Sequence, residues 1–116
     1  MVNTYIPNRG DLIFLDFDPQ KGHEESGRRP ALVLSPEEYN AKTSLVIVCP
    51  ITKQVKGYAF EVKLISQKKV EGVVLADHVK SFDWRKRNAQ LIEKINIQSY
   101  QEVIAKLHVL LAEELD

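Results

Sequence analysis

The sequence predicts one mainly β domain over residues 1–116, a small and mostly antiparallel barrel or sandwich that is closed by a C-terminal helix. Three observations support this prediction. The chain of 116 residues has the size of a single domain. Short apolar runs rich in β-branched residues, separated by turn residues, occupy residues 11–82. After residue 98 the apolar residues recur every three or four positions, as they do on one face of a helix.

The strands are expected at five apolar runs. Of these, "AFEVKL" alternates between apolar and polar residues, which is typical of a half-exposed strand. "LVIVC" is continuously apolar, which indicates a central strand buried on both sides, and Pro50 is expected to end it. The five runs are DLIFLDF (11–17), ALVLS (31–35), SLVIVCP (44–50), AFEVKL (59–64) and GVVLAD (72–77), of which the last could continue through VKSF (79–82).

Two helices are expected. "PEEYNAK" (36–42) is short, with Pro36 in its first turn. The C-terminal helix is expected to start at a capping box formed by Ser99 and Glu102. Its apolar face is expected to consist of Tyr100, Val103, Ile104, Leu107, Leu110, Leu111 and Leu115.

Charge is balanced overall but unevenly distributed. The formal net charge is zero, so the total gives no argument for nucleic acid. Residues 53–94, however, hold ten Lys or Arg against five Asp or Glu, whereas residues 95–116 hold one Lys and four acids. A basic segment of this kind can follow a polyanion, although a solvated surface would have the same composition.

Several classes of protein are disfavoured. Cys49 is the only cysteine, so no disulfide can form within the chain, and it is expected to be a small buried apolar residue rather than a nucleophile. No apolar run approaches 18 residues and no signal peptide is recognised, so we expect a cytoplasmic protein without membrane association. No P-loop, G-x-G-x-x-G or metal-binding spacing occurs, so neither a cofactor nor a metal is expected.

The connection between the first two predicted strands combines the residue types that phosphate chemistry needs. Pro30 biases the residue before it toward an extended backbone, so Arg29 is expected at the first residue of a strand, pointing in a defined direction. A guanidinium group offers a fixed fork of donors to phosphate or carboxylate. A solvated loop with a local Glu–Arg pair is the alternative. The candidate proton carriers are His23, Glu24 and Glu25, and the candidate clamps are Arg28 and Arg29.

Two later segments hold further candidates. In "CPITKQVKGY" (49–58), Thr52 is expected at a loop entrance, where its hydroxyl could donate to a phosphate oxygen. Lysine, threonine and aromatic side chains together suit single-stranded nucleic acid. In "ADHVKSFDWRKR" (76–87), His78 and Trp84 have structural roles as their simpler interpretation, a hydrogen-bonded histidine and a strand anchor.

Four stretches in the same order resemble the MazF/PemK family of toxin ribonucleases, and together they cover nearly the whole chain. They are YIPNRGDLIFLDFDP (5–19), KGHEESGRRPALVLSP (21–36), CPITKQVKGYAFEV (49–62) and GVVLADHVKSFDWRKR (72–87). The second contains a run similar to the family's G-x-R-P pattern. In the fourth, His78 stands where the family often has glutamine.

The resemblance implies a PemK/CcdB-like barrel related to SH3 folds, a homodimer and a labile MazE-like antitoxin that blocks the site. It also implies a toxin that inhibits translation and growth by sequence-specific, metal-independent cleavage of single-stranded RNA. Arg29 and Thr52 match the family's catalytic pair, and Glu24 matches an acidic residue implicated in activity. The residues expected to contact RNA are Asp18, Lys21, His23, Arg28, Lys53, Lys56, Tyr58, His78, Lys80, Arg85 and Arg87.

Three other functions remain open at this point. A gyrase-poisoning toxin of the CcdB type shares the fold but acts through a C-terminal Trp-Gly-Ile tail, whereas this sequence ends in AEELD. A catalytically silent module could bind RNA or antitoxin. A peptide binder of the SH3 type would need a groove of exposed aromatic residues, and the sequence has few aromatic residues.

Overall fold

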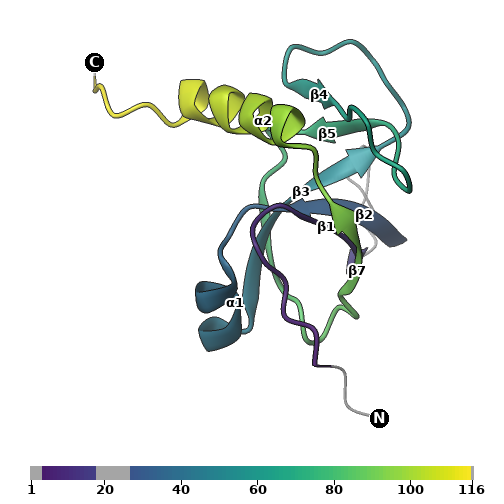
Figure 1. Ribbon diagram of the computed structural model, residues 1–116. Coiled ribbons are helices and arrows are strands. Elements are labelled where there is room, and N and C mark those ends of the chain that lie inside the picture. The colour runs from purple at the N-terminus through teal and green to yellow at the C-terminus, as the bar shows by residue number, and fades with distance from the viewer. Residues whose placement is uncertain (1–3, 18–26, 116) are drawn as a thin grey trace.

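The computed structural model describes residues 4–17 and 27–115, and within them it contains two helices and seven strands (Figure 1). The elements in chain order are β1 (Asp11–Phe17), β2 (Gly27–Val33), α1 (Glu37–Thr43), β3 (Leu45–Thr52), β4 (Glu61–Lys63), β5 (Val73–Leu75), β6 (Lys80–Asp83), β7 (Gln90–Lys94) and α2 (Ile97–Leu110). The predicted mainly β domain with a C-terminal helix is therefore observed.

The strands form one antiparallel sheet centred on β3. Its order is β4-β5-β3-β2-β1-β7, and β6 also pairs with β3. One edge of β3 pairs with β2, and the other edge pairs with β6 through Leu45–Val48 and then with β5 through Ile51 and Thr52. Because β3 changes partner along one edge, the sheet bends sharply there, and its strands wrap into the partly open barrel that Figure 1 shows.

Alternating residues of the sheet face two apolar clusters. Leu12 of β1 packs with Leu32 and Cys49 in the cluster beneath α2, to which the helix contributes Val103 and Leu107. The next residue, Ile13, faces the opposite cluster, which contains Trp84. This alternation is what the period-two pattern predicts for strands with both faces covered.

Four differences from the predicted strands are found. β2 begins at Gly27, so Arg29 is its third residue rather than its first. β3 continues past Pro50 to Thr52, so Pro50 does not end it and Thr52 lies in the strand. β7 was not predicted, because "QLIEK" has only two apolar residues and neither is buried. VKSF contributes to a separate strand, β6, rather than continuing β5.

The predicted capping box is wrong. The N-cap of α2 is Asn96, whose side chain accepts a hydrogen bond from the backbone N–H of Gln98 at 2.8 Å. The buried Ser99 hydroxyl instead donates to the carbonyl of Lys63 and accepts from the N–H of Ile65. Ser99 therefore attaches α2 to the end of β4, a tertiary role that the local sequence does not reveal.

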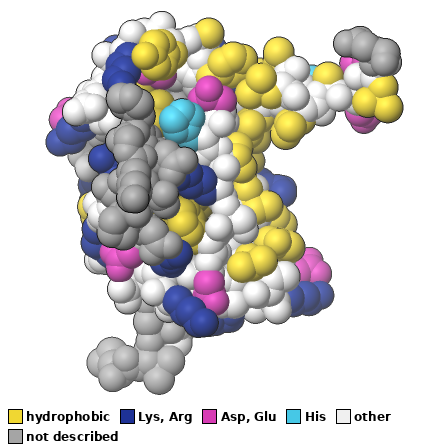
Figure 2. Space-filling model, turned by 180° about the vertical axis from the view of Figure 1, so that it is seen from behind, with side chains coloured by type: hydrophobic (Ala, Val, Ile, Leu, Met, Phe, Trp, Pro, Cys, Tyr) yellow, Lys and Arg dark blue, Asp and Glu magenta, His cyan; other side chains and the backbone are white. Residues whose placement is uncertain are grey.

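The outer half of α2 lacks the burial that its apolar spacing predicts. Leu110 is 47% exposed and Leu111 is 73% exposed, and the helix ends before Leu115, which is 95% exposed. In Figure 2 hydrophobic side chains line this projecting arm and continue onto the adjoining face. In the described part of the chain, no helix combines the length and apolar character needed to cross a membrane.

Asn40 is a buried polar residue that joins α1 to the rest of the protein. It is 0% exposed, and its amide nitrogen donates to the carbonyls of Pro7 at 2.8 Å and Ser35 at 3.0 Å. Its amide oxygen accepts the Ser35 hydroxyl at 2.6 Å, and its backbone carbonyl accepts the indole N–H of Trp84. The anchoring role predicted for Trp84 is confirmed.

Replacing Asn40 by alanine should lower the free energy of unfolding by about 2–4 kcal/mol, because each buried polar group left unpaired costs about 1–3 kcal/mol. Urea denaturation followed by circular dichroism measures the change. Lys42→Ala on the exposed side of the same helix is the control and should shift the midpoint little. A loss below about 1 kcal/mol for Asn40→Ala would show that water replaces the lost partners.

Candidate active site

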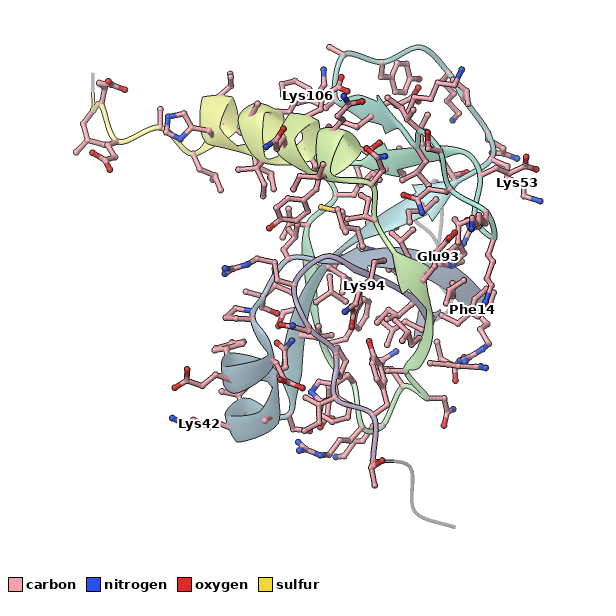
Figure 3. The ribbon with its side chains drawn as sticks, viewed as in Figure 1. Phe14, Lys42, Lys53, Glu93, Lys94 and Lys106 are labelled. Atoms are coloured by element: carbon pink, nitrogen blue, oxygen red, sulfur yellow. The ribbon has the colours of Figure 1, made fainter. Side chains whose placement is uncertain are left out.

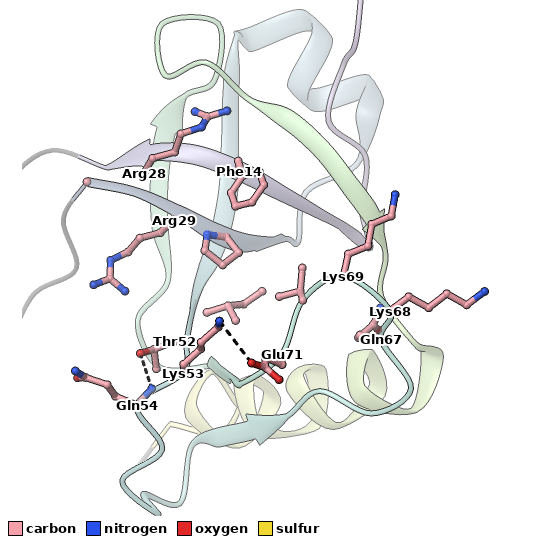
Figure 4. Close-up of a pocket in the computed structure, with 14 residues that line it drawn as sticks. Phe14, Arg28, Arg29, Thr52, Lys53, Gln54, Gln67, Lys68, Lys69 and Glu71 are labelled. Atoms are coloured by element: carbon pink, nitrogen blue, oxygen red, sulfur yellow. Dashed lines mark hydrogen bonds and ion pairs between the residues drawn. The ribbon is translucent and has the colours of Figure 1, made fainter.

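The ends of β2 and β3 and the segment 67–71 enclose an open groove of about 680 Å³ (Figure 4). This volume lies within the range of about 300–1,000 Å³ that is usual for ligand sites. Cationic side chains come from all three parts of its lining. The lining residues are Phe14, Gly27, Arg28, Arg29, Pro30, Ile51, Thr52, Lys53, Gln54, Gln67, Lys68, Lys69, Val70 and Glu71.

Arg28 is held in place at one side of the groove. Its guanidinium donates to the carboxylate of Asp16 at 2.9 Å and to the side-chain oxygen of Gln90 at 3.2 Å, and it lies 5.6 Å from the ring centre of Phe14. Hydrogen bonds from Asn88 and Arg28 keep the pKa of Asp16 below its usual value. The carboxylate therefore stays ionised and retains Arg28 until the pH falls through this lowered pKa.

Arg29 and Thr52 come from different strands and line the same groove. Pairing of β1 with β2 places Arg29 opposite Leu15, and Thr52 is the last residue of β3, paired with Val73. The Thr52 hydroxyl accepts the backbone N–H of Gln54 at 3.1 Å, so its own proton remains available for donation. Both side chains are half-buried and open toward the groove (Figure 4).

Gly72 allows the backbone to approach Thr52 closely. A Cβ atom at this position would lie 2.2 Å from the carbonyl oxygen of Thr52, and Gly72 also has a φ of +120°. No other residue type fits this position without movement of the backbone. The position of Thr52 therefore depends on the absence of a side chain at residue 72.

The connection after Thr52 is folded by a carboxylate. Glu61 accepts the backbone N–H groups of Lys56 at 3.1 Å and Gly57 at 2.9 Å. Tyr58 is 66% exposed on this connection and lines a second hollow beside the groove. Lys53, at the boundary of the two hollows, forms an exposed ion pair with Glu71 at 3.5 Å.

Comparison with known proteins identifies what kind of protein has this groove. Residues 8–111 match the family model described as the PemK-like, MazF-like toxin of type II toxin–antitoxin systems. The chain belongs to this toxin family. The family predicted from the sequence is therefore confirmed.

The toxin is similar to known proteins over nearly its whole length. It is 50% identical to the endoribonuclease toxin MazF of Escherichia coli K12 over 111 residues, which cover 96% of this chain and 99% of the relative. The crystal structure of MazF from Deinococcus radiodurans has 51% identity and a TM-score of 0.86, and the match covers 92% of this chain and 97% of that one. A MazE–MazF crystal structure from the same organism has 50% identity and a TM-score of 0.84, covering 95% and 99%. The predicted fold is thus confirmed, and the names of the relatives agree with the prediction of an RNA-cleaving enzyme.

Some of the predicted RNA contacts lie outside the groove of the toxin. Arg85 lies 4.2 Å from the ring centre of Trp84, and Arg87 donates to the backbone carbonyl of Asp16. Lys80 is half-buried in β6. His78 is half-buried in the turn after β5, with its ring 3.8 Å from the carboxylate of Asp77. Their contact with RNA stays a prediction.

Five predicted residues lie outside the described part of the toxin. They are Asp18, Lys21, His23, Glu24 and Glu25. Of the predicted residues that the structure describes, Arg28, Arg29, Thr52 and Lys53 line the groove.

One wall of the groove and one residue at its edge were not predicted from the sequence. Gln67, Lys68 and Lys69 form this wall, and Phe14 lies beside Arg28. Lys68 and Lys69 belong to the basic segment 53–94 that the sequence shows. However, no pattern in the sequence predicts that residues 67–71 lie beside β2. Phe14 lies in an apolar run of the sequence, which does not show that its side chain is 38% exposed once β1 is paired in the sheet.

Cys49 of the toxin is a buried core residue, as expected. Burial, together with the nearby Asp77, raises the pKa of its thiol to about 12, so it has no nucleophilic thiolate at neutral pH. Within residues 4–17 and 27–115, no three His, Cys, Asp or Glu side chains gather into a possible metal site. The expectation that neither metal nor cofactor is needed stays a prediction.

Proposed function

We propose that this toxin cleaves single-stranded RNA in the groove by attack of a ribose 2′-hydroxyl on the adjacent phosphate. The observation that supports this most directly is that Arg29 and Thr52, from different strands, line one open groove with cations on its walls. Such a groove can follow a phosphate backbone. The groove is also open to solvent rather than an enclosed cavity.

The reaction has three requirements. The bond from O2′ to phosphorus forms and the bond from phosphorus to O5′ breaks, so a base takes the 2′ proton and an acid supplies a proton to O5′. Meanwhile extra negative charge develops on the phosphate oxygens. Products with a 2′,3′-cyclic phosphate and a 5′-hydroxyl result.

Arg29 and Thr52 suit the stabilisation of this charge. The guanidinium remains ionised and can contact two phosphate oxygens, and the Thr52 hydroxyl can donate one further hydrogen bond. A guanidinium group is a poor base, so Arg29 is not assigned the role of proton acceptor. Glu24 is the better candidate base, and His23 and His78 are candidate proton carriers because histidine titrates near neutral pH.

The partners form part of the same proposal. The crystal structure of a relative at 50% identity is named a MazE–MazF complex, which supports a MazE-like antitoxin for this chain. An acidic, disordered antitoxin tail could cover the cationic groove.

A homodimer is supported by the exposed apolar end of α2, because apolar patches of this kind mark interfaces. We place the activity in the cytoplasm, where the free thiol of Cys49 is kept reduced.

Purified toxin should cut naked RNA in the presence of EDTA and leave 2′,3′-cyclic phosphate and 5′-hydroxyl ends. The reason is that the 2′-hydroxyl is the nucleophile and Arg29 and Thr52 supply the charge stabilisation. Sequencing the fragment ends identifies the recognised bases and the cleavage position. Mass spectrometry of the fragments then identifies the end groups.

The matched control is the same RNA with deoxyribose at the cleavage position, which should bind but not be cut. Cleavage of this substrate, or loss of cleavage in EDTA, would contradict the mechanism. Binding without any cleavage of the natural RNA would instead indicate a catalytically silent module.

A further inference from the structure

One wall of the groove is held in place by a single carboxylate. Glu93 of β7 accepts three consecutive backbone N–H groups, those of Lys68 at 3.2 Å, Lys69 at 2.8 Å and Val70 at 3.0 Å. Gln67 adds two contacts, since its amide donates to the carbonyl of Lys94 and accepts the N–H of Asn96. Residues 67–70, which we call the lysine wall, are therefore bound along β7.

The charge state of Glu93 agrees with this role. Desolvation raises the pKa of Glu93, but the hydrogen bonds from Lys69 and Lys68, with those of Gln67 and Val70, outweigh it and leave the pKa lowered. The carboxylate is therefore ionised at neutral pH, and its oxygens face backbone donors. Figure 3 shows Glu93 on the same side of the molecule as Phe14 and Lys53, two lining residues of the groove.

The side chains of the lysine wall differ from the other cations of the groove. The guanidinium of Arg28 is bound to Asp16, and the ammonium of Lys53 to Glu71. Among the described residues, neither Lys68 nor Lys69 has a carboxylate within ion-pair distance. Both are exposed. In Figure 4 they lie on the opposite side of the groove from Arg28 and Arg29, where the Lys69 side chain follows the edge of the groove and the Lys68 side chain extends outward into solvent.

We propose that Lys68 and Lys69 bind RNA phosphates on the side of the groove opposite Arg28 and Arg29, and that Glu93 is the positioning residue that holds them there. This inference rests on the proposed function, because it assigns a second phosphate-binding wall to the same groove. RNA is favoured over the antitoxin as the ligand, since the wall shares a continuous lining with Arg29 and Thr52, which act on the phosphodiester. A strand whose scissile phosphate lies at Arg29 passes along the lysine wall.

Substituting the two lysines tests the contact directly. Lys68→Gln and Lys69→Gln should each weaken binding of the deoxyribose-substituted RNA by about two- to fivefold at low salt, as is usual for exposed ion pairs. Each should also reduce the slope of log K against log salt by about 0.7, the value for one phosphate contact on a single strand. Lys42→Gln on α1, on the far side of the molecule (Figure 3), is the matched control and should change neither quantity.

The test of Glu93 depends on the sign of the effect. Removing a negative charge beside a groove for RNA should strengthen binding by electrostatics alone. Glu71→Gln is the matched control for this, because it also releases Lys53 from its ion pair, and it should bind RNA more tightly. Glu93→Ala should instead bind more weakly, with a higher KM, an unchanged kcat and a smaller salt slope. Glu93→Gln, which keeps one acceptor oxygen, should recover part of the loss.

The outcomes are distinguishable. RNA binding that is unchanged or stronger in Glu93→Ala, or salt slopes that stay the same in both lysine variants, would overturn this inference while leaving the cleavage mechanism intact. Lysine variants that lose affinity for the antitoxin but not for RNA would also overturn it. A complete absence of RNA binding by the unmodified toxin would overturn the proposed function as well. The lysine side chains are exposed, so their substitution tests the inference even if Glu93→Ala unfolds.

Discussion

Replacing Arg29 by alanine should lower the rate of RNA cleavage by about 10²–10³ and leave the fold intact. Removal of one donor that stabilises transition-state charge typically has an effect of this size. Arg29 is half-buried at the edge of the groove rather than in either apolar cluster, so its loss leaves the core unchanged. Single-turnover cleavage at saturating enzyme measures the chemical step, and light scattering should give the same mass as for the unsubstituted toxin.

Two controls separate geometry from charge. Arg29→Lys keeps the charge but loses the planar fork, so it should recover only a small part of the rate. Lys42→Ala removes a positive charge on the far side of the molecule and should leave the rate unchanged. Thr52→Ala should resemble Arg29→Ala, whereas Thr52→Ser, which keeps the hydroxyl, should retain most of the activity. A fully active Arg29→Ala would refute the role assigned to the guanidinium.

Replacing Gly72 by alanine should be the most damaging single-methyl change among the glycines described here. The new Cβ would lie 2.2 Å from the carbonyl oxygen and 2.9 Å from the carbonyl carbon of Thr52. Positive φ adds strain of about 1–2 kcal/mol for a residue with a side chain, and overpacking adds about 1–3 kcal/mol. We therefore expect the free energy of unfolding to fall by about 2–5 kcal/mol. Misplacement of a catalytic group by about 1 Å can reduce the rate 10²-fold, so activity should fall as well.

Gly57→Ala is the matched control for Gly72→Ala. Gly57 also has a positive φ, +80°, but nothing lies within 4 Å of the Cβ that would be added there. It should therefore show the strain without the collision, a loss of about 1–2 kcal/mol with the groove unchanged. Thermal unfolding and cleavage rates of both variants provide the comparison. Equal effects of the two substitutions would show that the close approach to Thr52 is unimportant.

The sequence predicted those strands whose own side chains enter the core, and it missed elements that are held by contacts with distant parts of the chain. Strands with continuous or alternating apolar residues were predicted because their side chains enter the core directly, as in β1 and β3. β7 was missed because Leu91 and Ile92 are not fully buried and the strand is held mainly by pairing with β1. The start of α2 was misplaced because Ser99 binds β4 across the tertiary structure while Asn96 provides the cap.

The residues of the candidate site divide in the same way, into those that the sequence predicted and those that only tertiary contacts place in the groove. The sequence predicted Arg29, Thr52 and Lys53, which the structure brings to one groove. It could not predict the lysine wall, because the three N–H groups that bind Glu93 are more than twenty residues away along the chain. Backbone hydrogen bonds carry no residue-type signature, so a glutamate that organises them resembles any solvent-exposed acid. The role of Gly72 was hidden for a similar reason, since the sequence does not show which backbone a glycine will face.

The pairing of the first strand with the last has a consequence for the synthesis of the protein. Asp11 at the start of β1 pairs with Lys94 at the end of β7, 83 positions later. On the ribosome, where a chain emerges at about 5–20 residues per second, β1 therefore has no partner at this edge until residues 90–94 have been made. β7 also contains Glu93, so the lysine wall can be held beside the groove only after β7 has been made. Chains that end before β7 consequently contain Arg29 and Thr52 but lack the carboxylate that holds residues 68–70 beside them.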